Sequence, residues 1–108
     1  MPKRVFLSLP FAGRTDEEVS EEMREMVDRY LWTKNVDPND VSFVATYFCP
    51  KEIDEKAKAT KHPNLVYMSY AFEVMSQCDD VIFSKNWKDA RGCQVEHLAY
   101  ELYMGGKA

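Results

Sequence analysis

Apolar residues recur along this chain in two patterns: short continuous runs, and longer stretches with a spacing of three or four. The short runs at residues 5–9, 41–47 and 81–83 are rich in β-branched and aromatic side chains, and they predict three buried strands. The stretches with the wider spacing lie between and after these runs, and they predict helices. The expected order of elements is therefore strand, helix, strand, helix, strand, helix.

The first helix has the clearest boundaries. Pro10 ends the first strand, and a loop over residues 10–14 follows it. Thr15 with Glu18 three residues later is a capping-box pattern, which predicts a helix beginning after Thr15. Apolar side chains then recur at helical spacing at Val19, Met23, Met26, Val27, Tyr30 and Leu31.

The second half of the chain predicts two more helices. Residues 49–64 are polar and lysine-rich between two prolines, which favours a surface excursion with room for a short helix. Residues 65–77 predict a largely buried helix with Leu65, Met68, Phe72 and Met75 on its apolar stripe. The last helix is expected to stop at Gly105–Gly106 and to bury an apolar face of Val95, Leu98, Ala99, Leu102 and Tyr103.

Strands that alternate with helices favour parallel pairing through right-handed crossovers. We therefore expect a single α/β domain over residues 1–108, a small three-layer Rossmann-like or flavodoxin-like fold with a short parallel sheet and flanking helices. In such sheets ligands bind beyond the carboxyl ends of the strands. Two loops then matter most for function, residues 10–14 and residues 84–92.

Composition narrows the classes of partner. The chain is 45% hydrophobic and 30% charged with a net charge of -4, which is typical of a globular protein and disfavours nucleic acid or an anionic membrane as partner. No apolar run approaches the roughly 20 residues that span a bilayer. Cys49, Cys78 and Cys93 are widely spaced and odd in number, which favours reduced thiols and a cytoplasmic location.

Glu96 is the leading candidate for chemistry. It falls near the first turn of the last helix, just after the loop that leaves the third strand, so its carboxylate can project toward the strand ends. The alternative is a solvated glutamate whose charge favours the helix N-terminus. Position alone leaves both interpretations open.

Two segments carry a resemblance to a known family. Cys78-Asp79-Asp80-Val81-Ile82-Phe83 is followed by Trp87, Gly92 and Glu96, and the chain opens with the run from Val5 through Pro10 to Gly13. Together they resemble the nucleoside 2-deoxyribosyltransferase superfamily, in particular its small phage and bacterial members of unassigned function. The resemblance implies cleavage or transfer of an N-glycosidic bond of a nucleoside or nucleoside 5′-monophosphate, with Glu96 as the nucleophile.

The resemblance and the two loops together suggest the substrate-binding residues. The sugar-side loop corresponds to Ser8, Pro10, Phe11 and Gly13. The indole of Trp87 offers a face for a base or sugar, although such a side chain is as often simple packing. The starts of the first and last helices place Arg14, Arg91 and Gly92 where cations and N–H groups can hold a phosphate, unless both arginines are ordinary surface charges.

Three positions depart from the family pattern and keep other functions open. Ala90 stands where relatives that act on nucleotides carry a serine, Ala71 lies where an aspartate is common, and Phe6 lies where a tyrosine is common. These departures motivate a non-catalytic nucleotide-binding or sensing module, and a scaffold domain of the same fold is a third alternative.

Cys93 and His97 are four residues apart without a second ligand pair, so neither a metal nor a cofactor is expected. A homodimer or higher homo-oligomer is expected, since a short sheet leaves edges to cover.

Overall fold

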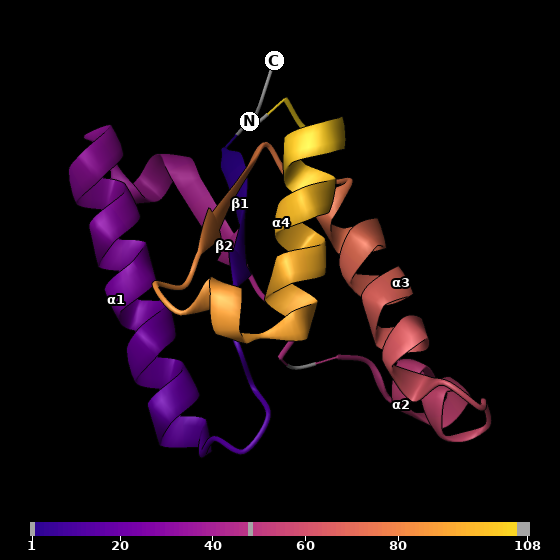
Figure 1. Ribbon diagram of the computed structural model, residues 1–108. Helices are drawn as coiled ribbons and strands as arrows, with labels where there is room; N and C mark the ends of the chain where they lie inside the picture. Colours follow the sequence, from indigo (N-terminus) through magenta and orange to yellow (C-terminus); the bar gives the residue numbers. More distant parts are fainter. Residues whose placement is uncertain (1, 48, 106–108) are drawn as a thin grey trace.

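A three-stranded parallel sheet forms the centre of the protein. The computed structural model describes residues 2–47 and 49–105. β1 (Lys3–Ser8) lies between β2 (Val41–Val44) and β3 (Asp80–Phe83), and both neighbours run parallel to it (Figure 1). The parallel α/β architecture expected from the alternation of elements is confirmed.

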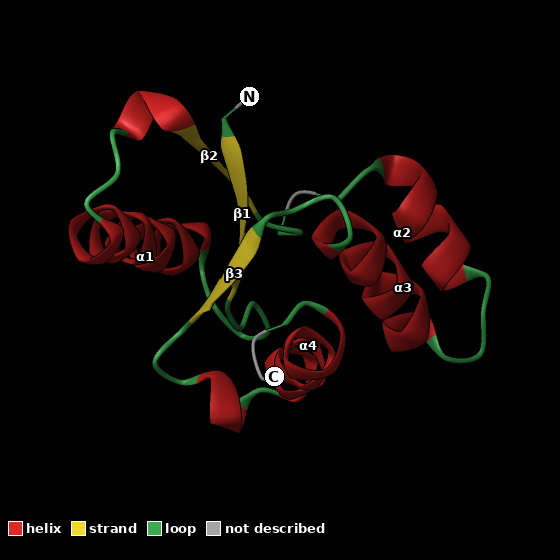
Figure 2. Ribbon diagram, turned by 90° about the horizontal axis from the view of Figure 1, so that it is seen from above, coloured by secondary structure: helices red, strands yellow, loops and turns green. Residues whose placement is uncertain are grey.

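Helices cover both faces of this sheet. α1 (Asp16–Lys34) lies on one face, whereas α3 (Pro63–Met75) and α4 (Arg91–Tyr103) lie toward the other, with α4 close to β3 (Figure 2). α2 (Lys51–Lys58) packs on α3, away from the strands, so the lysine-rich excursion does contain a short helix. Single 3-10 turns precede β2 at Pro38–Asp40 and α4 at Trp87–Asp89.

The alternating side chains of β1 divide the core between the two faces. Leu7 packs with the buried α1 residues Val19 and Met26, whereas Phe6 packs with Ala71 and Val81 on the side of α3 and α4. Successive strand residues point to opposite faces, so Ser8 shares the face of Phe6 and lies toward α4. Burial of each large apolar side chain in this layer contributes roughly 1.5–3 kcal/mol.

The start of α1 is capped as the sequence predicts. The backbone N–H of Glu18 donates to Oγ1 of Thr15 over 3.1 Å, and the backbone N–H of Thr15 donates to Oε1 of Glu18 over 2.9 Å. At the other end, Asn35 adopts a left-handed backbone conformation with a φ of 52°, and its N–H donates to the carbonyl of Leu31. α1 is thereby held in a fixed position next to the loop that follows β1.

β2 is shorter than predicted. It ends at Val44, whereas the apolar run predicted a strand up to Tyr47. Its pairing with β1 ends where Phe6 lies opposite Val44, and Ala45 and Thr46 lead away from the sheet. Tyr47 instead packs against Phe11 of the loop after β1, with ring centroids 5.0 Å apart.

The predicted burial of α3 and α4 is wrong for most of their apolar stripes. In α3 only Ala71 and Met75 are buried, while Leu65 is 68% exposed. In α4 the inward residues are Cys93 and Glu96, and the outward face carries Val95, Leu98, Leu102 and Tyr103. A sheet of three short strands is too narrow to cover both helices, so they meet the core along a thin line and leave their apolar faces uncovered.

α4 ends at Tyr103, and Gly105 follows with a φ of 79°. This agrees with the predicted glycine stop, of which Gly106 lies outside the described residues.

None of the helices in the described parts of the chain combines the length and apolar character needed to cross a bilayer.

Candidate functional site

Glu96 lies inside the fold, at the end of the central strand. Its Oε1 accepts a hydrogen bond of 2.5 Å from Oγ of Ser8, the last residue of β1. Ser8 is 1% exposed and Glu96 is 8% exposed. The carboxylate is therefore aimed at the carboxyl ends of the strands, as its position in the sequence predicts, and the solvated alternative is wrong.

Burial dominates the ionisation of this carboxyl group. It raises the pKa of Glu96 from 4.5 to about 7, while the hydrogen bond from Ser8 acts in the opposite direction because it favours the charged form. Near neutral pH both the protonated and the ionised forms are thus populated. Strongly shifted carboxyl groups are typical of sites that carry out proton transfer or nucleophilic chemistry.

A second carboxylate lies at the same end of the sheet. Glu22, on the second turn of α1, accepts through Oε1 a charge-assisted hydrogen bond of 2.5 Å from the guanidinium of Arg14. Its Oε2 accepts a hydrogen bond from the hydroxyl of Ser84, the buried residue that follows β3. Glu22 therefore ties the loop after β1 to the loop after β3.

Adjacent backbone brings these two carboxylates near each other. The backbone N–H of Ser84 donates to the carbonyl of Ser8 over 2.8 Å, so the partners of Glu22 and Glu96 sit side by side on neighbouring strand ends. Cys93 lies among them. Burial, together with the charges of Glu96 and Glu22 and against a hydrogen bond with Ser8, raises the pKa of this thiol to about 11, so the thiol is neutral and a poor nucleophile.

The loop after β1 is stabilised by contacts within itself. The Arg14 guanidinium donates to the Pro10 carbonyl over 3.0 Å, and the backbone N–H of Arg14 donates to the Phe11 carbonyl over 3.2 Å. Gly13 has a φ of 73°, a left-handed conformation that favours glycine. The loop expected to lie beside a sugar thus has a defined shape, but its arginine is already engaged.

Trp87 is packed against a neighbouring ring. Its indole stacks on the imidazole of His97 with centroids 3.7 Å apart and an interplanar angle of 4°. His97 in turn pairs through Nδ1 with Oε1 of Glu101 at 2.7 Å and packs against Phe83. One face of the indole is therefore covered, which favours the packing role for Trp87.

Arg91 and Gly92 occupy the first turn of α4, as expected. Both are exposed, and Ala90 before them caps the helix without a side-chain hydrogen bond. A Cβ added at Gly92 would lie 3.7 Å from Sδ of Met68, an ordinary packing distance. Arg91 is exposed, whereas the guanidinium of Arg14 pairs with Glu22 at 2.5 Å.

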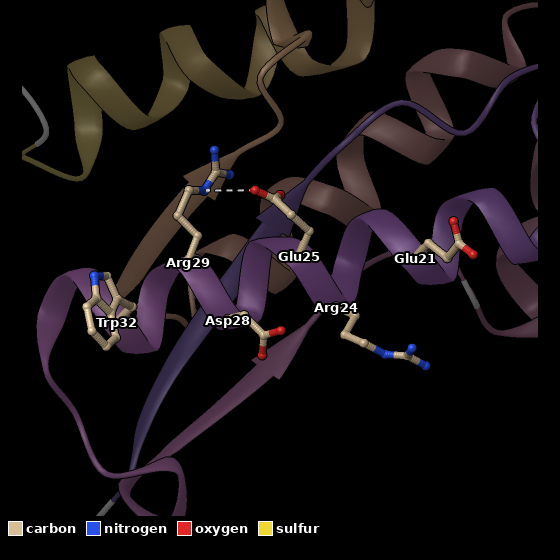
Figure 3. A pocket seen from close by; sticks show the side chains of 6 residues that line it. All are labelled: Glu21, Arg24, Glu25, Asp28, Arg29 and Trp32. Atoms are coloured by element: carbon tan, nitrogen blue, oxygen red, sulfur yellow. Dashed lines mark ion pairs between the residues drawn. The ribbon is translucent and has the colours of Figure 1, made fainter.

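Two of the hollows on the described surface lie away from Glu96. The first, of about 570 Å³, lies along the outer face of α1, where Arg29 faces Glu25 at 3.9 Å and Trp32 closes one end (Figure 3). The second, of about 640 Å³, lies between α3 and α4 and is lined by Phe72, Ala99 and Tyr103 among others.

Glu22, Ser84 and Cys93 contribute to the site but were not predicted. Glu22 could have been found from its spacing, because it lies three residues after Val19 and four before Met26 on the buried line of α1. A carboxylate inside an apolar helix stripe needs a partner, and here the partners are Arg14 and Ser84. Cys93 could also have been found from its spacing, because it lies three residues before Glu96 on the buried line of α4.

The described residues contain no group of three or more histidine, cysteine, aspartate or glutamate side chains placed to hold a metal ion. Cys93 points into the core, whereas His97 pairs with Glu101. Comparison of the chain with models of known protein families, with curated proteins and with solved structures gave no significant match. The function is therefore argued from the geometry of the site.

Proposed function

We propose that this protein cleaves or transfers the N-glycosidic bond of a nucleoside or nucleoside 5′-monophosphate, with Glu96 as the nucleophile. The observation that carries the proposal is the buried Ser8–Glu96 hydrogen bond of 2.5 Å at the carboxyl end of the central strand. A carboxylate held in this way is oriented toward the place where parallel α/β sheets bind their ligands.

The proposed chemistry uses the fraction of molecules in which Glu96 is ionised, which at neutral pH is substantial although burial raises the pKa. The ionised Glu96 oxygen attacks the anomeric carbon while the C–N bond breaks, and the base leaves with the bonding electrons and takes up a proton. Water then attacks the same carbon and restores the carboxylate with release of a proton, which gives a hydrolase. If the nitrogen of a second base attacks instead, the protein is a transferase.

Ser8 acts as a positioning residue for this attack. Its hydroxyl donates to Oε1 and leaves Oε2 as the oxygen available to a sugar. The hydrogen bond also lowers the pKa of Glu96, which increases the ionised fraction at neutral pH. Both effects favour the nucleophilic form.

A non-catalytic nucleoside-binding or sensing module is the second candidate. The observation that favours it is the set of hydrogen bonds by which Glu22 ties the loop after β1 to the loop after β3. Such a module would bind its ligand at these loops and leave the glycosidic bond intact.

Base release separates the two candidates. The protein is incubated with the four common deoxynucleosides and their 5′-monophosphates, alone and with a second free base, and base release is followed by chromatography. We expect release by the unchanged protein and a loss of at least a hundredfold in Glu96→Gln. Glu73→Gln, which removes an exposed carboxylate from α3, is the matched control. Binding without release would support the sensing module, and release that survives Glu96→Gln would overturn both roles of Glu96.

We further propose that the protein works as a homodimer in the cytoplasm. The outward stripe of α4 places Val95, Leu98 and Leu102 at helical spacing, with exposures of 43%, 58% and 65%. The same helix contributes Ala99 and Tyr103 to the hollow that it shares with Phe72 of α3. A two-fold axis near Leu98 would bring Val95 of one copy against Leu102 of the other, so the surface is self-complementary. The three cysteines are unpaired, which favours a reducing compartment.

A further inference from the structure

Arg14 is the only cation of the loop after β1, and its guanidinium is held by three oxygen atoms of the protein. One nitrogen lies 2.5 Å from Glu22 and 3.0 Å from the Pro10 carbonyl, and the other donates to the Glu18 carbonyl over 3.3 Å. The side chains of Arg14 and Glu22 are 24% and 17% exposed, so the pair is partly shielded from water. An incoming anion would meet a cation whose charge is already neutralised.

The rest of this strand-end region also disfavours an anion. Glu22 and Glu96 both place carboxylates there, since their hydroxyl partners Ser84 and Ser8 are joined by a backbone hydrogen bond of 2.8 Å. Ala90 carries no hydroxyl, and α4 begins without a side-chain cap. A phosphate bound here would have to take Arg14 away from Glu22 and leave that carboxylate without its cation beside a second negative group.

We infer that Glu22 determines the substrate class of this site: by holding Arg14, it selects an uncharged nucleoside and excludes the 5′-monophosphate. The inference rests on the proposed function and narrows it. Glu22 is a specificity-determining residue that acts through Arg14, since it holds the guanidinium against the Pro10 loop. Its removal frees a cation next to the sugar-side loop.

Equilibrium binding tests this assignment without any need for turnover. In a Glu96→Gln background, calorimetry gives the dissociation constants of the four deoxynucleosides and of their 5′-monophosphates. We expect at least one deoxynucleoside to bind ten or more times more tightly than its monophosphate. Adding Glu22→Gln should shift that ratio at least tenfold toward the monophosphate. Adding Glu21→Gln, which removes an exposed carboxylate of the same helix, should leave the ratio unchanged.

Arg14→Gln supplies an independent variant if Glu22→Gln does not fold. In the Glu96→Gln background, Arg14→Gln should leave the preference for the nucleoside in place, because the guanidinium does not contact the ligand. Combined with Glu22→Gln, it should remove the gained affinity for the monophosphate. A tighter monophosphate complex before any change at Glu22, a ratio insensitive to Glu22→Gln, or no binding of any deoxynucleoside would each overturn the inference.

These outcomes are separable from those of the proposed function. A nucleoside preference in binding without base release by the unchanged protein would contradict catalysis and keep the role of Glu22. Efficient base release from monophosphates in preference to nucleosides would keep catalysis and contradict the role of Glu22. Monophosphate binding that depends on Arg91 would also overturn the inference, because it would place the phosphate at α4 and not at Arg14.

Discussion

The hydroxyl of Ser8 and the carboxylate of Glu96, 88 residues apart in the sequence, are joined by a buried hydrogen bond of 2.5 Å. Ser8 ends the central strand, and Glu96 lies on the inward line of α4. A buried carboxyl group with one hydroxyl donor is poised between its two protonation states, and this property leads to the first two predictions.

The rate of base release should depend on the ionisation of Glu96. Because the ionised form attacks, kcat/KM should rise as the pH passes about 7 and then level off. Ser8→Ala removes the hydrogen bond that lowers this pKa, so the rise should move to higher pH. Ser42→Ala, at an exposed strand position, should leave the profile in place. A rate that falls through this range would identify Glu96 as a general acid and contradict its role as the nucleophile.

The free energy of unfolding should also depend on the ionisation of Glu96. The pKa of Glu96 is raised in the folded state, so the folded protein binds more protons than the unfolded chain between pH 4.5 and about 7, and stability falls as the pH rises through this window. The shift corresponds to about 3 kcal/mol. The free energy of unfolding is measured with urea for the unchanged protein and for Glu96→Gln. The difference between the two should change by about this amount in favour of the variant from pH 4.5 to 7.5. A difference that stays constant with pH would contradict the assigned burial.

The stack of Trp87 on His97 should be visible in fluorescence. His97→Ala uncovers one face of the indole, so the emission of Trp87 should shift to longer wavelength. Trp32 is 88% exposed and would mask the change, so the measurement is made in a Trp32→Phe background. His62→Ala, at an exposed position before α3, is the matched control. An unchanged spectrum would show that the indole is not covered by His97.

The outward face of α4 should determine the oligomeric state. Leu98→Lys places a charge in the middle of the apolar stripe and should convert a dimer into a monomer, as measured by light scattering during gel filtration. Trp32→Lys, at an even more exposed position on α1, should leave the dimer intact. A monomer for the unchanged protein at high concentration would contradict the proposed assembly.

The helix start that the sequence predicted correctly was indicated by a local signal. Thr15 and Glu18 mark the start of α1 because a capping box needs only four residues. The position of Glu96 followed from the rule that parallel strands present their carboxyl ends to a ligand, combined with the order of elements.

The features that the sequence did not predict are which helix faces are buried and which side chains pair, because both depend on how the elements pack together. An apolar stripe such as Val95, Leu98 and Leu102 predicts that something covers it, but the periodicity does not say whether the cover is the chain's own sheet or a second molecule. The ion pair of Arg14 with Glu22 was likewise not predicted, because it forms only when the loop after β1 folds back on α1. Tertiary contacts, and not local preference, decided both.

The nucleophilic role of Glu96 is tested most directly by trapping the glycosyl-enzyme. Deoxynucleosides carrying fluorine at the 2′ position slow the breakdown of such an ester, and intact-mass and peptide mass spectrometry then locate the sugar. We expect the mass of one fluorinated deoxysugar on the peptide that contains Glu96, and no adduct in Glu96→Gln. Base release that proceeds without an adduct, or with the sugar attached to another residue, would contradict the account.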